Sequence, residues 1–409
     1  MVRVKAGLIS AGIARFLAAA AALAVVGVAL TVAQSGTTAS ESTSAGAAAA
    51  AEKASGGKLA YRVFGSHGRT WIVATNIDGT KVRQLVRPVH HDWSEYSWSP
   101  NGKKLAASLD EIVVARDGGP SRTVVPAARG TGIDGVRWSP KSNSLAFIRN
   151  PVISTSTCVG GAVWIVDATG RNRRRLTRPA GPDSFLTTED WSPAGKRLLY
   201  QATTYDNQCQ DTLGSRLITV GRDGSSPRVV TNVIGAAAWL AAWSPSGSKI
   251  AYLSCAFHGG WLPCEVWVVD VTGSHRHRVG GEVNMWGGPG LEWTRDGREL
   301  VIPYLCPPGD CVSPGDDCDA KTWSGGLRAI DVATGQTRSL VSRPGCASPE
   351  LRAISRSGST IGFVWVALDG TLLGPPMLVG SDGTGLRALP PPPKIAGSDV
   401  SPWPAFYLP

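Results

Sequence analysis

The sequence predicts an all-β fold, a seven-bladed β-propeller closed by a C-terminal strand, with six blades as the alternative. Two observations predict it: a tryptophan followed by a tight turn recurs along the chain, and a second strand pair follows each copy. The five clear copies carry Trp98, Trp138, Trp191, Trp243 and Trp293. Their spacings of 40, 53, 52 and 50 residues are typical of stacked supersecondary units and too long for a helical period.

One repeat is expected to form four short antiparallel strands, named A to D in chain order. The Ser-Pro-x-Gly step after the tryptophan suits a type I turn, because proline presets the backbone angle and glycine tolerates the conformation at the end of the turn. This turn joins strands A and B. A second turn, such as Asp167 to Gly170 or Asp270 to Gly273, joins strands C and D.

Counting the strand pairs gives seven units. The C–D hairpins are expected at 71–86, 111–125, 162–177, 215–230, 265–280, 325–341 and 375–390. The first unit has no A strand of its own, and 399–406 (DVSPWPAF) at the other end of the chain repeats the Ser-Pro step. We expect a strand near 398–402 to pair with 58–64, because such closure removes the free edges of an open sheet. The tryptophans are then core between blades.

The N-terminal part of the chain predicts export. Basic residues precede an uncharged apolar run at 16–33, so 1–33 is interpreted as a signal peptide or a retained signal anchor. Residues 34–57 are small and polar and predict a flexible tether, and 58–409 form the propeller. Contact with a membrane is expected only through the N-terminal segment.

The formal net charge is +10, with basic runs at 171–178 and 275–278. Charged residues at an outer strand protect it from pairing with other molecules. We prefer this interpretation to nucleic-acid binding, and no nucleic-acid partner is expected.

The motif W-S-P-x-G-x-x-[LI]-A, followed by x-[IV]-V-D-x-T-G, resembles the WD-like repeats of the TolB family. It is also similar to the propeller half of prolyl-oligopeptidase-type enzymes. The resemblance covers about 58–406 and implies a scaffold rather than a site. The chain departs from TolB in having seven units instead of six and no preceding α/β domain, and it has no G-x-S-x-G nucleophile motif of a hydrolase.

The cysteines lie at one end of the expected ring. We call it the loop rim, formed by the B–C and D–A loops, and call the opposite end, with the A–B and C–D turns, the turn rim. The eight cysteines of the loop rim are Cys158, Cys209, Cys255, Cys264, Cys306, Cys311, Cys318 and Cys346. An even number in an exported chain favours disulfides. Cys255 is expected to pair with Cys264, and a Cys158–Cys209 bridge is geometrically sensible, whereas pairing among the last four stays open. No zinc-type spacing occurs, so neither a metal nor a cofactor is predicted.

Long loops on a rigid scaffold commonly carry function, and exposed aromatic residues are enriched at binding surfaces. The candidate binding residues of the loop rim are His90, His91, Trp93, Tyr205, His258, Trp261, Trp286 and Trp323. The predicted function is that of an exported, monomeric, non-catalytic module that binds an envelope protein or an extracellular ligand.

The alternative function is a lyase or glycosidase with acids in the central channel. Asp190, Glu292 and Asp399 lie beside the tryptophan positions of the A strands. An ion pair between Arg137 and Asp190 of adjacent blades explains that acid equally well.

Overall fold

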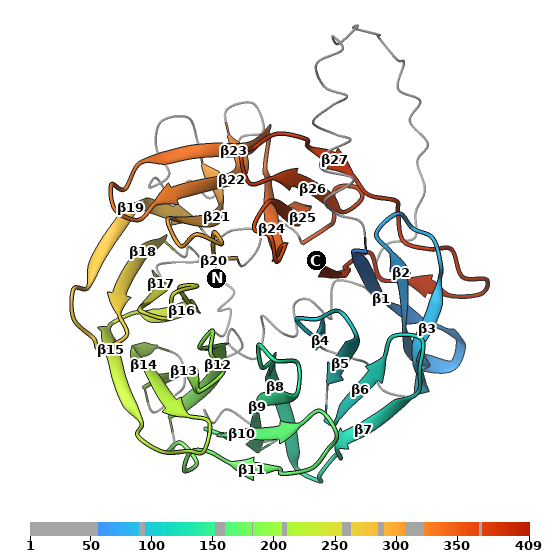
Figure 1. Cartoon of the computed structure of the whole chain (residues 1–409), viewed down its shortest axis with the longest axis horizontal. Coiled ribbons are helices and arrows are strands. Elements are labelled where there is room, and N and C mark those ends of the chain that lie inside the picture. Colours follow the sequence, from blue (N-terminus) through green and yellow to red (C-terminus); the bar gives the residue numbers. More distant parts are fainter. Residues whose placement is uncertain are drawn as a thin grey trace, which may run out of the picture.

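The computed structural model describes residues 56–89, 95–108, 110–151, 160–181, 183–206, 211–255, 263–284, 290–306, 323–367 and 370–409. Within these ranges the chain forms 29 strands in seven sheets and one short 3-10 helix, η1 (Ser66–Gly68). The sheets surround a common axis as seven blades (Figure 1). The prediction of seven blades is confirmed, and the six-bladed alternative is wrong.

The expected export segment lies outside the described residues, as does the tether up to residue 55. No helix of the described part of the chain is long and apolar enough to span a membrane.

Blade 1 joins the two ends of the propeller. Its strands are β1 (Lys58–Phe64), β2 (Thr70–Asn76), β3 (Arg83–Val89), β28 (Asp399–Val400) and β29 (Ala405–Tyr407). Both C-terminal strands pair with β1: β28 meets its end at Val63 and Phe64, and β29 meets its beginning at Lys58 to Ala60. Closure by a strand near 398–402 is therefore confirmed. The second segment, β29, extends the pairing beyond the predicted strand.

The other blades each contain four strands in sequence order, with the first strand nearest the axis (Figure 1). Blades 2, 3 and 4 are β4 (Glu95–Trp98), β5 (Lys104–Ser108), β6 (Ile112–Arg116), β7 (Ser121–Val125); β8 (Thr131–Trp138), β9 (Ser144–Pro151), β10 (Ala162–Asp167), β11 (Arg174–Arg175); and β12 (Ser184–Trp191), β13 (Arg197–Tyr205), β14 (Thr212–Gly221), β15 (Arg228–Ile234). Blades 5, 6 and 7 are β16 (Ala237–Trp243), β17 (Lys249–Cys255), β18 (Pro263–Asp270), β19 (His277–Asn284); β20 (Glu292–Trp293), β21 (Glu299–Cys306), β22 (Ser324–Asp331), β23 (Thr337–Pro344); and β24 (Ala347–Ile354), β25 (Thr360–Ala367), β26 (Met377–Gly380), β27 (Arg387–Ala388).

The core is divided among the seven interfaces between neighbouring blades, and the described residues form one apolar cluster at each. Strand β17 shows why its apolar residues do not alternate with polar ones. Ile250 and Tyr252 pack toward blade 4, whereas Ala251 and Leu253 pack toward blade 6. Both faces of a blade are buried, as expected for sheets stacked around a ring.

The five repeated tryptophans are at most 9% exposed, so the prediction that they are core between blades is confirmed. Three of them also join blades through the indole. Trp138 Nε1 donates to Ser97 O at 3.1 Å, and Trp293 Nε1 donates to Ala242 O at 3.1 Å. Trp191 Nε1 donates to Arg137 O at 3.3 Å. Each acceptor is the residue before the tryptophan position of the preceding blade, so the bond is a repeated feature of the ring.

The A–B turn uses its serine and glycine in a repeated way. In blade 4, Arg197 N donates to Ser192 Oγ at 3.0 Å and Gly195 N donates to Ser192 O at 2.7 Å. Gly195 has φ +68°. Glycine adopts this conformation at little cost because it has no Cβ. The hydroxyl bond recurs from Ser99 in blade 2 to Ser355 in blade 7. The turn rim therefore has a nearly constant backbone on which side chains vary.

We predict that Trp138→Phe destabilises the protein by about 1 kcal/mol more than Trp243→Phe does. Both substitutions remove similar buried volume, but only the first leaves a carbonyl, Ser97 O, without its indole donor. Trp243 Nε1 has no hydrogen-bond partner within the described residues. Urea unfolding of both variants measures the difference, and equal losses would show that the indole bond contributes nothing.

Candidate functional site

Acidic side chains gather at the axis, on the innermost strands. Glu189 and Asp190 lie in β12 and Glu292 lies in β20, while Arg137 lies in β8. Of the acids considered from the sequence, Asp190 and Glu292 come close enough for the charge of Asp190 to raise the pKa of Glu292. Asp399 instead begins β28, where it pairs with Phe64 in blade 1.

The sequence did not indicate Glu189 as an axial acid, because the direction of its side chain depends on a β-bulge. The register of β12 against β13 shifts between Thr188 and Asp190, which leaves Glu189 unpaired in the ladder. A bulge adds one residue to a strand and re-aims the side chains around it. Two consecutive acids therefore both reach blade 5.

Asp190 and Glu189 accept hydrogen bonds from the backbone of β16. Asp190 Oδ2 accepts from Trp243 N at 2.9 Å, and its Oδ1 accepts from Trp191 N at 2.7 Å. Glu189 Oε2 accepts from Ala241 N at 3.0 Å. These bonds lie at the interface where Trp243 lacks the indole hydrogen bond. The two carboxylates therefore supply the hydrogen bonds that connect the inner strands of blades 4 and 5.

Other axial acids also have structural partners. Glu95 Oε2 accepts from Val136 N of the next blade at 3.0 Å. Glu350 is 2.9 Å from Arg352 Nη2, and this guanidinium lies over the ring of Trp403 at 5.0 Å. Glu292 differs: its backbone pairs with Val301, but its carboxylate has no hydrogen-bond or ion-pair partner among the residues that the structure describes.

The surroundings raise the pKa values of these acids. Desolvation, which disfavours a charged carboxylate, raises the pKa of Glu189 and raises that of Asp190 to about 6 despite the two backbone N–H donors. Desolvation also raises the pKa of Glu292 to about 7, and repulsion from Asp190 adds to it. The Glu292 side chain is accessible to solvent. Water therefore screens part of this penalty.

Arg137 does not form the direct ion pair with Asp190 that was considered from the sequence. Its Nε donates to the carbonyl oxygen of Glu189 at 3.0 Å, and within the described ranges no carboxylate oxygen lies within 4 Å of it. Its positive charge still lowers the pKa values of Asp190 and Glu292. The axis thus holds three carboxyl groups of raised pKa, Glu189, Asp190 and Glu292, beside a cation that acts at longer range.

The loop rim is described only in part. The candidates outside the described residues are His90, His91, Trp93, His258, Trp261 and Trp286. Tyr205 ends β13 with a partly buried side chain, and its backbone N donates to Asp183 O at 2.8 Å. Trp323 is 7% exposed, so the expectation that its side chain lies at the surface is wrong. It packs in the interior where the chain enters β22, and its carbonyl accepts from Gly345 N at 2.8 Å.

The predicted Cys255–Cys264 disulfide is confirmed, with an S–S distance of 2.04 Å. The two residues are register partners on β17 and β18, 4.1 Å apart at Cα, so the bridge closes the loop between the strands at its base. Cys346 is also disulfide-bonded. Cys158, Cys209, Cys311 and Cys318 lie outside the described residues, as does the side chain of Cys306. Within the described ranges, no group of three or more His, Cys, Asp or Glu residues is placed to hold a metal ion.

Comparison with known proteins identifies the fold. No family model and no curated protein matches the sequence. Among solved structures, an oligogalacturonate lyase from Vibrio parahaemolyticus is similar over 76% of this chain and 83% of its own, with 11% identity and a TM-score of 0.50. A protein described as TolB from Agrobacterium tumefaciens is similar over 71% of this chain and 90% of its own, with 18% identity and a TM-score of 0.43. An acylaminoacyl peptidase from Pyrococcus horikoshii is similar over 78% of this chain and 49% of its own, with 13% identity and a TM-score of 0.50.

The chain is a β-propeller. The TolB protein and propeller enzymes both occur among its structural relatives, as the repeat motif led us to expect. At these identities the similarity establishes the scaffold alone, because unrelated sites occur on one fold.

We predict that Glu292→Gln raises the melting temperature at pH 8 and leaves it unchanged near pH 4.5. A carboxyl group with a raised folded-state pKa is protonated more readily in the folded state. Its ionisation therefore costs stability as pH rises from about 4.5, its ordinary pKa, through about 7. Glutamine, which is always neutral, avoids this cost.

The control for Glu292→Gln is Asp270→Asn. The pKa of Asp270 is lowered to about 2, mainly by hydrogen bonds from Lys249 and His275, so its ionised form is favourable in the folded state. Asp270→Asn should melt lower at pH 8. Scanning calorimetry at both pH values measures the direction of each change in melting temperature. A lower melting temperature of Glu292→Gln at pH 8 would show that the pKa of Glu292 is not raised in the folded protein.

Proposed function

We propose that the protein is an exported, non-catalytic propeller that binds a partner protein or ligand of the cell envelope through its loop rim. The observation that carries this proposal is the use of the axial acids. Glu189 and Asp190 accept backbone N–H groups of blade 5, and Glu350 pairs with Arg352. Carboxylates whose oxygens already accept these bonds have few lone pairs left to bind a substrate or to transfer its protons.

The loop rim is the end that differs most from blade to blade. Its B–C connections range from three residues between Ser108 and Ile112 to 17 residues between Cys306 and Ser324. A disulfide at the base of one such loop, Cys255–Cys264, limits the conformations of that loop. Loops held on a rigid scaffold are typical binding elements.

Export is proposed from the basic and apolar N-terminal sequence, residues 1–33, together with the disulfide. Disulfides persist in oxidising compartments and are rare in the cytosol. The binding partner is accordingly sought outside the cytoplasmic membrane.

One observation favours a second function, acid–base catalysis at the axis. The Glu292 carboxylate has no described partner and has a pKa raised to about 7, and Asp190 has one raised to about 6. Groups with pKa values near the working pH suit proton transfer. A propeller lyase acting on an acidic oligosaccharide is among the structural relatives. Release of unsaturated products from oligogalacturonate, abolished by Glu292→Gln, would establish this function instead.

The binding proposal is tested with the variant Trp261→Ala/Trp286→Ala. Because aromatic residues supply much of the free energy at protein interfaces, this variant should retain about tenfold less partner in a pull-down from envelope extract. The control is Leu386→Ala, which removes a side chain that is 49% exposed near the turn rim.

Quantitative mass spectrometry of the retained proteins measures the result. Melting temperatures are measured for all three proteins, so that a loss of binding can be told from a loss of folding. Equal recovery by the double variant and the unmodified chain, or a selective loss with Leu386→Ala, would place binding away from the loop rim.

A further inference from the structure

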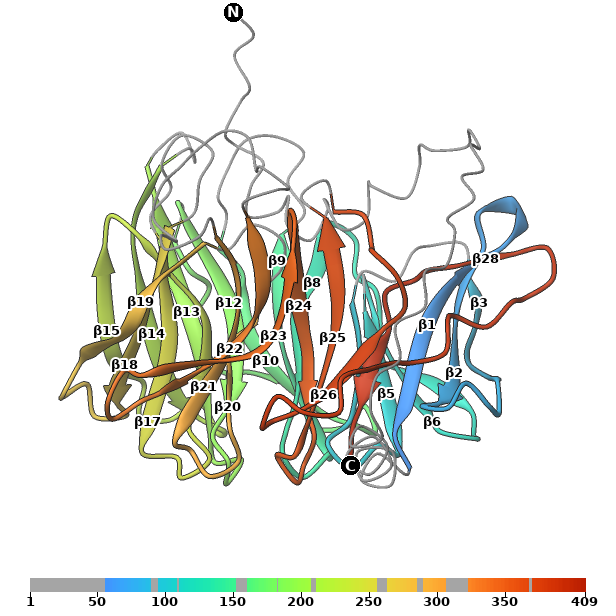
Figure 2. The ribbon, with the colours of Figure 1, turned by 90° about the horizontal axis from the view of Figure 1, so that it is seen from above.

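A basic groove lies on the turn rim, between blades 3 and 4. It is a cavity of about 630 Å³, and its charged lining residues are Lys141, Arg174, Lys196, Arg197, Arg222 and Asp223. The lining contains five cationic side chains and one carboxylate. The A–B and C–D turns that form it lie at the lower end of the ring in Figure 2. The groove is therefore separate from both the axial acids and the loop rim.

The cations of the groove bind mostly neutral acceptors. Arg197 Nη2 donates to Ser226 O at 2.6 Å and to Thr219 Oγ1 at 3.0 Å. Arg174 Nη2 donates to Arg222 O at 2.7 Å. These bonds orient the guanidinium groups without neutralising them. Lys141 and Lys196 are both exposed.

Two carboxylates, Asp167 and Asp223, compensate part of the charge of the five cations. Hydrogen bonds from Ser225 lower the pKa of the Asp223 carboxyl, and the positive charge of Arg174 helps to lower it. Arg222 Nη2 lies 3.9 Å from Asp167 Oδ1 and also donates to Ser144 Oγ. Asp223, the carboxylate in the lining, accepts from the backbone N and the hydroxyl of Ser225. A clear excess of positive charge therefore faces the solvent.

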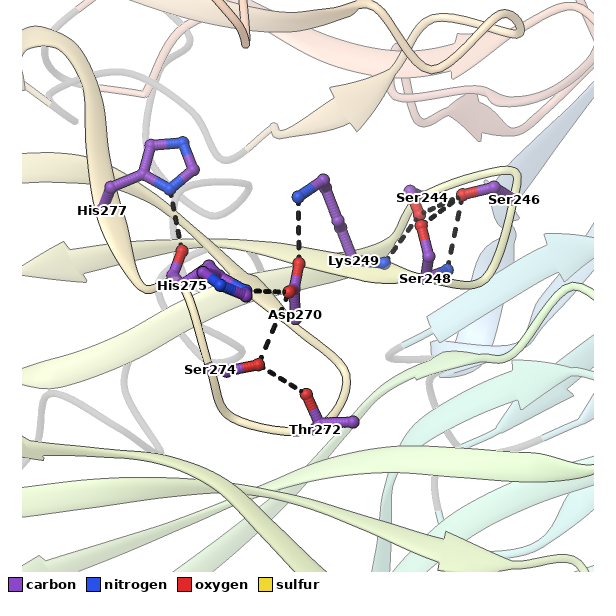
Figure 3. A network of polar contacts seen from close by, with 9 residues as sticks. All are labelled: Ser244, Ser246, Ser248, Lys249, Asp270, Thr272, Ser274, His275 and His277. Atoms are coloured by element: carbon purple, nitrogen blue, oxygen red, sulfur yellow. Dashed lines mark hydrogen bonds and ion pairs between the residues drawn. The ribbon is translucent and has the colours of Figure 1, made fainter.

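In blade 5 the cationic side chains at the same turns are paired with a carboxylate (Figure 3). Lys249 Nζ lies 2.9 Å from Asp270 Oδ1, and His275 Nδ1 lies 2.6 Å from Asp270 Oδ2. The aspartate stands at the first position of the C–D turn, where its carbonyl accepts from Gly273 N at 2.8 Å. In this blade the cation and its counter-ion come from the two adjacent turns.

Blade 4 keeps the same backbone but lacks that carboxylate. The carbonyl of Gly221 accepts from Gly224 N at 2.8 Å, so Gly221 occupies the position of Asp270. Arg197 occupies the position of Lys249, because each follows its turn hydroxyl by five residues and donates to it through the backbone. Blade 4 thus retains the cation of blade 5 without its anion. Blade 2 does the same, because Arg116 occupies the turn position of Asp270 and its carbonyl accepts from Gly119 N.

A second basic cavity lies at the neighbouring junction, between blades 2 and 3. It measures about 230 Å³, and its charged lining residues are Lys104, Arg116 and Arg122, with no carboxylate. Lys104 Nζ donates to Ser142 O of the blade 3 turn at 3.2 Å. Positive charge therefore continues along the turn rim over three blades.

We propose that the basic groove binds a linear polymer of phosphate groups. Its volume exceeds that of a single phosphate, and the second cavity extends the positive track, so a chain fits better than an isolated ion. Phosphate presents oxygens in several directions and matches both the forked guanidinium and the point charge of lysine, whereas a carboxylate presents one plane. None of the lining residues is aromatic, which disfavours single-stranded nucleic acid because its binding relies on base stacking.

The experiment is isothermal titration of the full chain with linear polyphosphate at about 50 mM salt, where binding of polyanions is strong. The test variant is Lys141→Glu/Lys196→Glu, which reverses two exposed charges of the groove. We expect it to weaken binding by about tenfold or more. Melting temperatures confirm that the variants remain folded.

The matched control is Arg298→Glu. Arg298 occupies the position of Lys196 in blade 6, because its carbonyl accepts from Val332 N as that of Lys196 accepts from Arg222 N. Its side chain is 82% exposed and lies 4.0 Å from Asp296. Binding should change less than about twofold, since this cation already has an acidic neighbour.

Three outcomes would overturn the proposal. The groove is not the site if the double variant binds polyphosphate like the unmodified chain. Attraction by the overall charge explains the binding if Arg298→Glu weakens it as much as the double variant. The polymer class is wrong if polygalacturonate or single-stranded DNA binds at least as tightly with the same dependence on Lys141 and Lys196.

Discussion

The structure depends on the closure of the ring at β1. Each blade buries both faces, so no blade has a complete core until it has a neighbour on each side. The C-terminal β28 and β29 pair with β1, while Phe406 and Leu408 fill the cluster between blades 7 and 1. Without this contact the first and last sheets would expose apolar faces and unpaired strand edges. Pairing of the two chain ends therefore completes the last of the seven interfaces and gives every blade a neighbour on both sides.

Around the axis the blades are joined in two chemically different ways. At three interfaces an indole N–H donates to the carbonyl of the preceding blade. Between blades 4 and 5, Glu189 and Asp190 accept backbone N–H groups instead. Carboxylates make strong acceptors, but their burial costs free energy, and the raised pKa values of this pair express that cost. A cluster of axial acids with shifted pKa values is thus explained largely by architecture, with Glu292 as the exception.

The two ends of the ring vary in different ways. The turn rim keeps one backbone, set by a hydroxyl acceptor and a left-handed glycine, and blades differ there through single side chains such as Asp270 and Gly221. The loop rim varies in the length of its connections, and it carries the Cys255–Cys264 disulfide. A change of charge on a constant turn suits recognition of a simple repeating anion. Loops of different length suit recognition of a shaped partner.

The blade count, the core role of the tryptophans, the closure by the C-terminus and the Cys255–Cys264 pairing could all be predicted from the sequence. The first two follow from local patterns, because turn chemistry and strand periodicity act over a few residues and recur from blade to blade. The closure follows from the missing A strand of the first unit and the Ser-Pro step at 399–406, and the pairing follows from two cysteines that flank one loop. Which charges meet across blades could be seen only in the folded arrangement. The bulge at Glu189, the burial of Trp323 and the basic groove at Lys141 and Lys196 depend on register and on neighbours distant in the chain. A one-residue shift of register changes which side chain faces a neighbour, and the linear pattern does not encode such shifts.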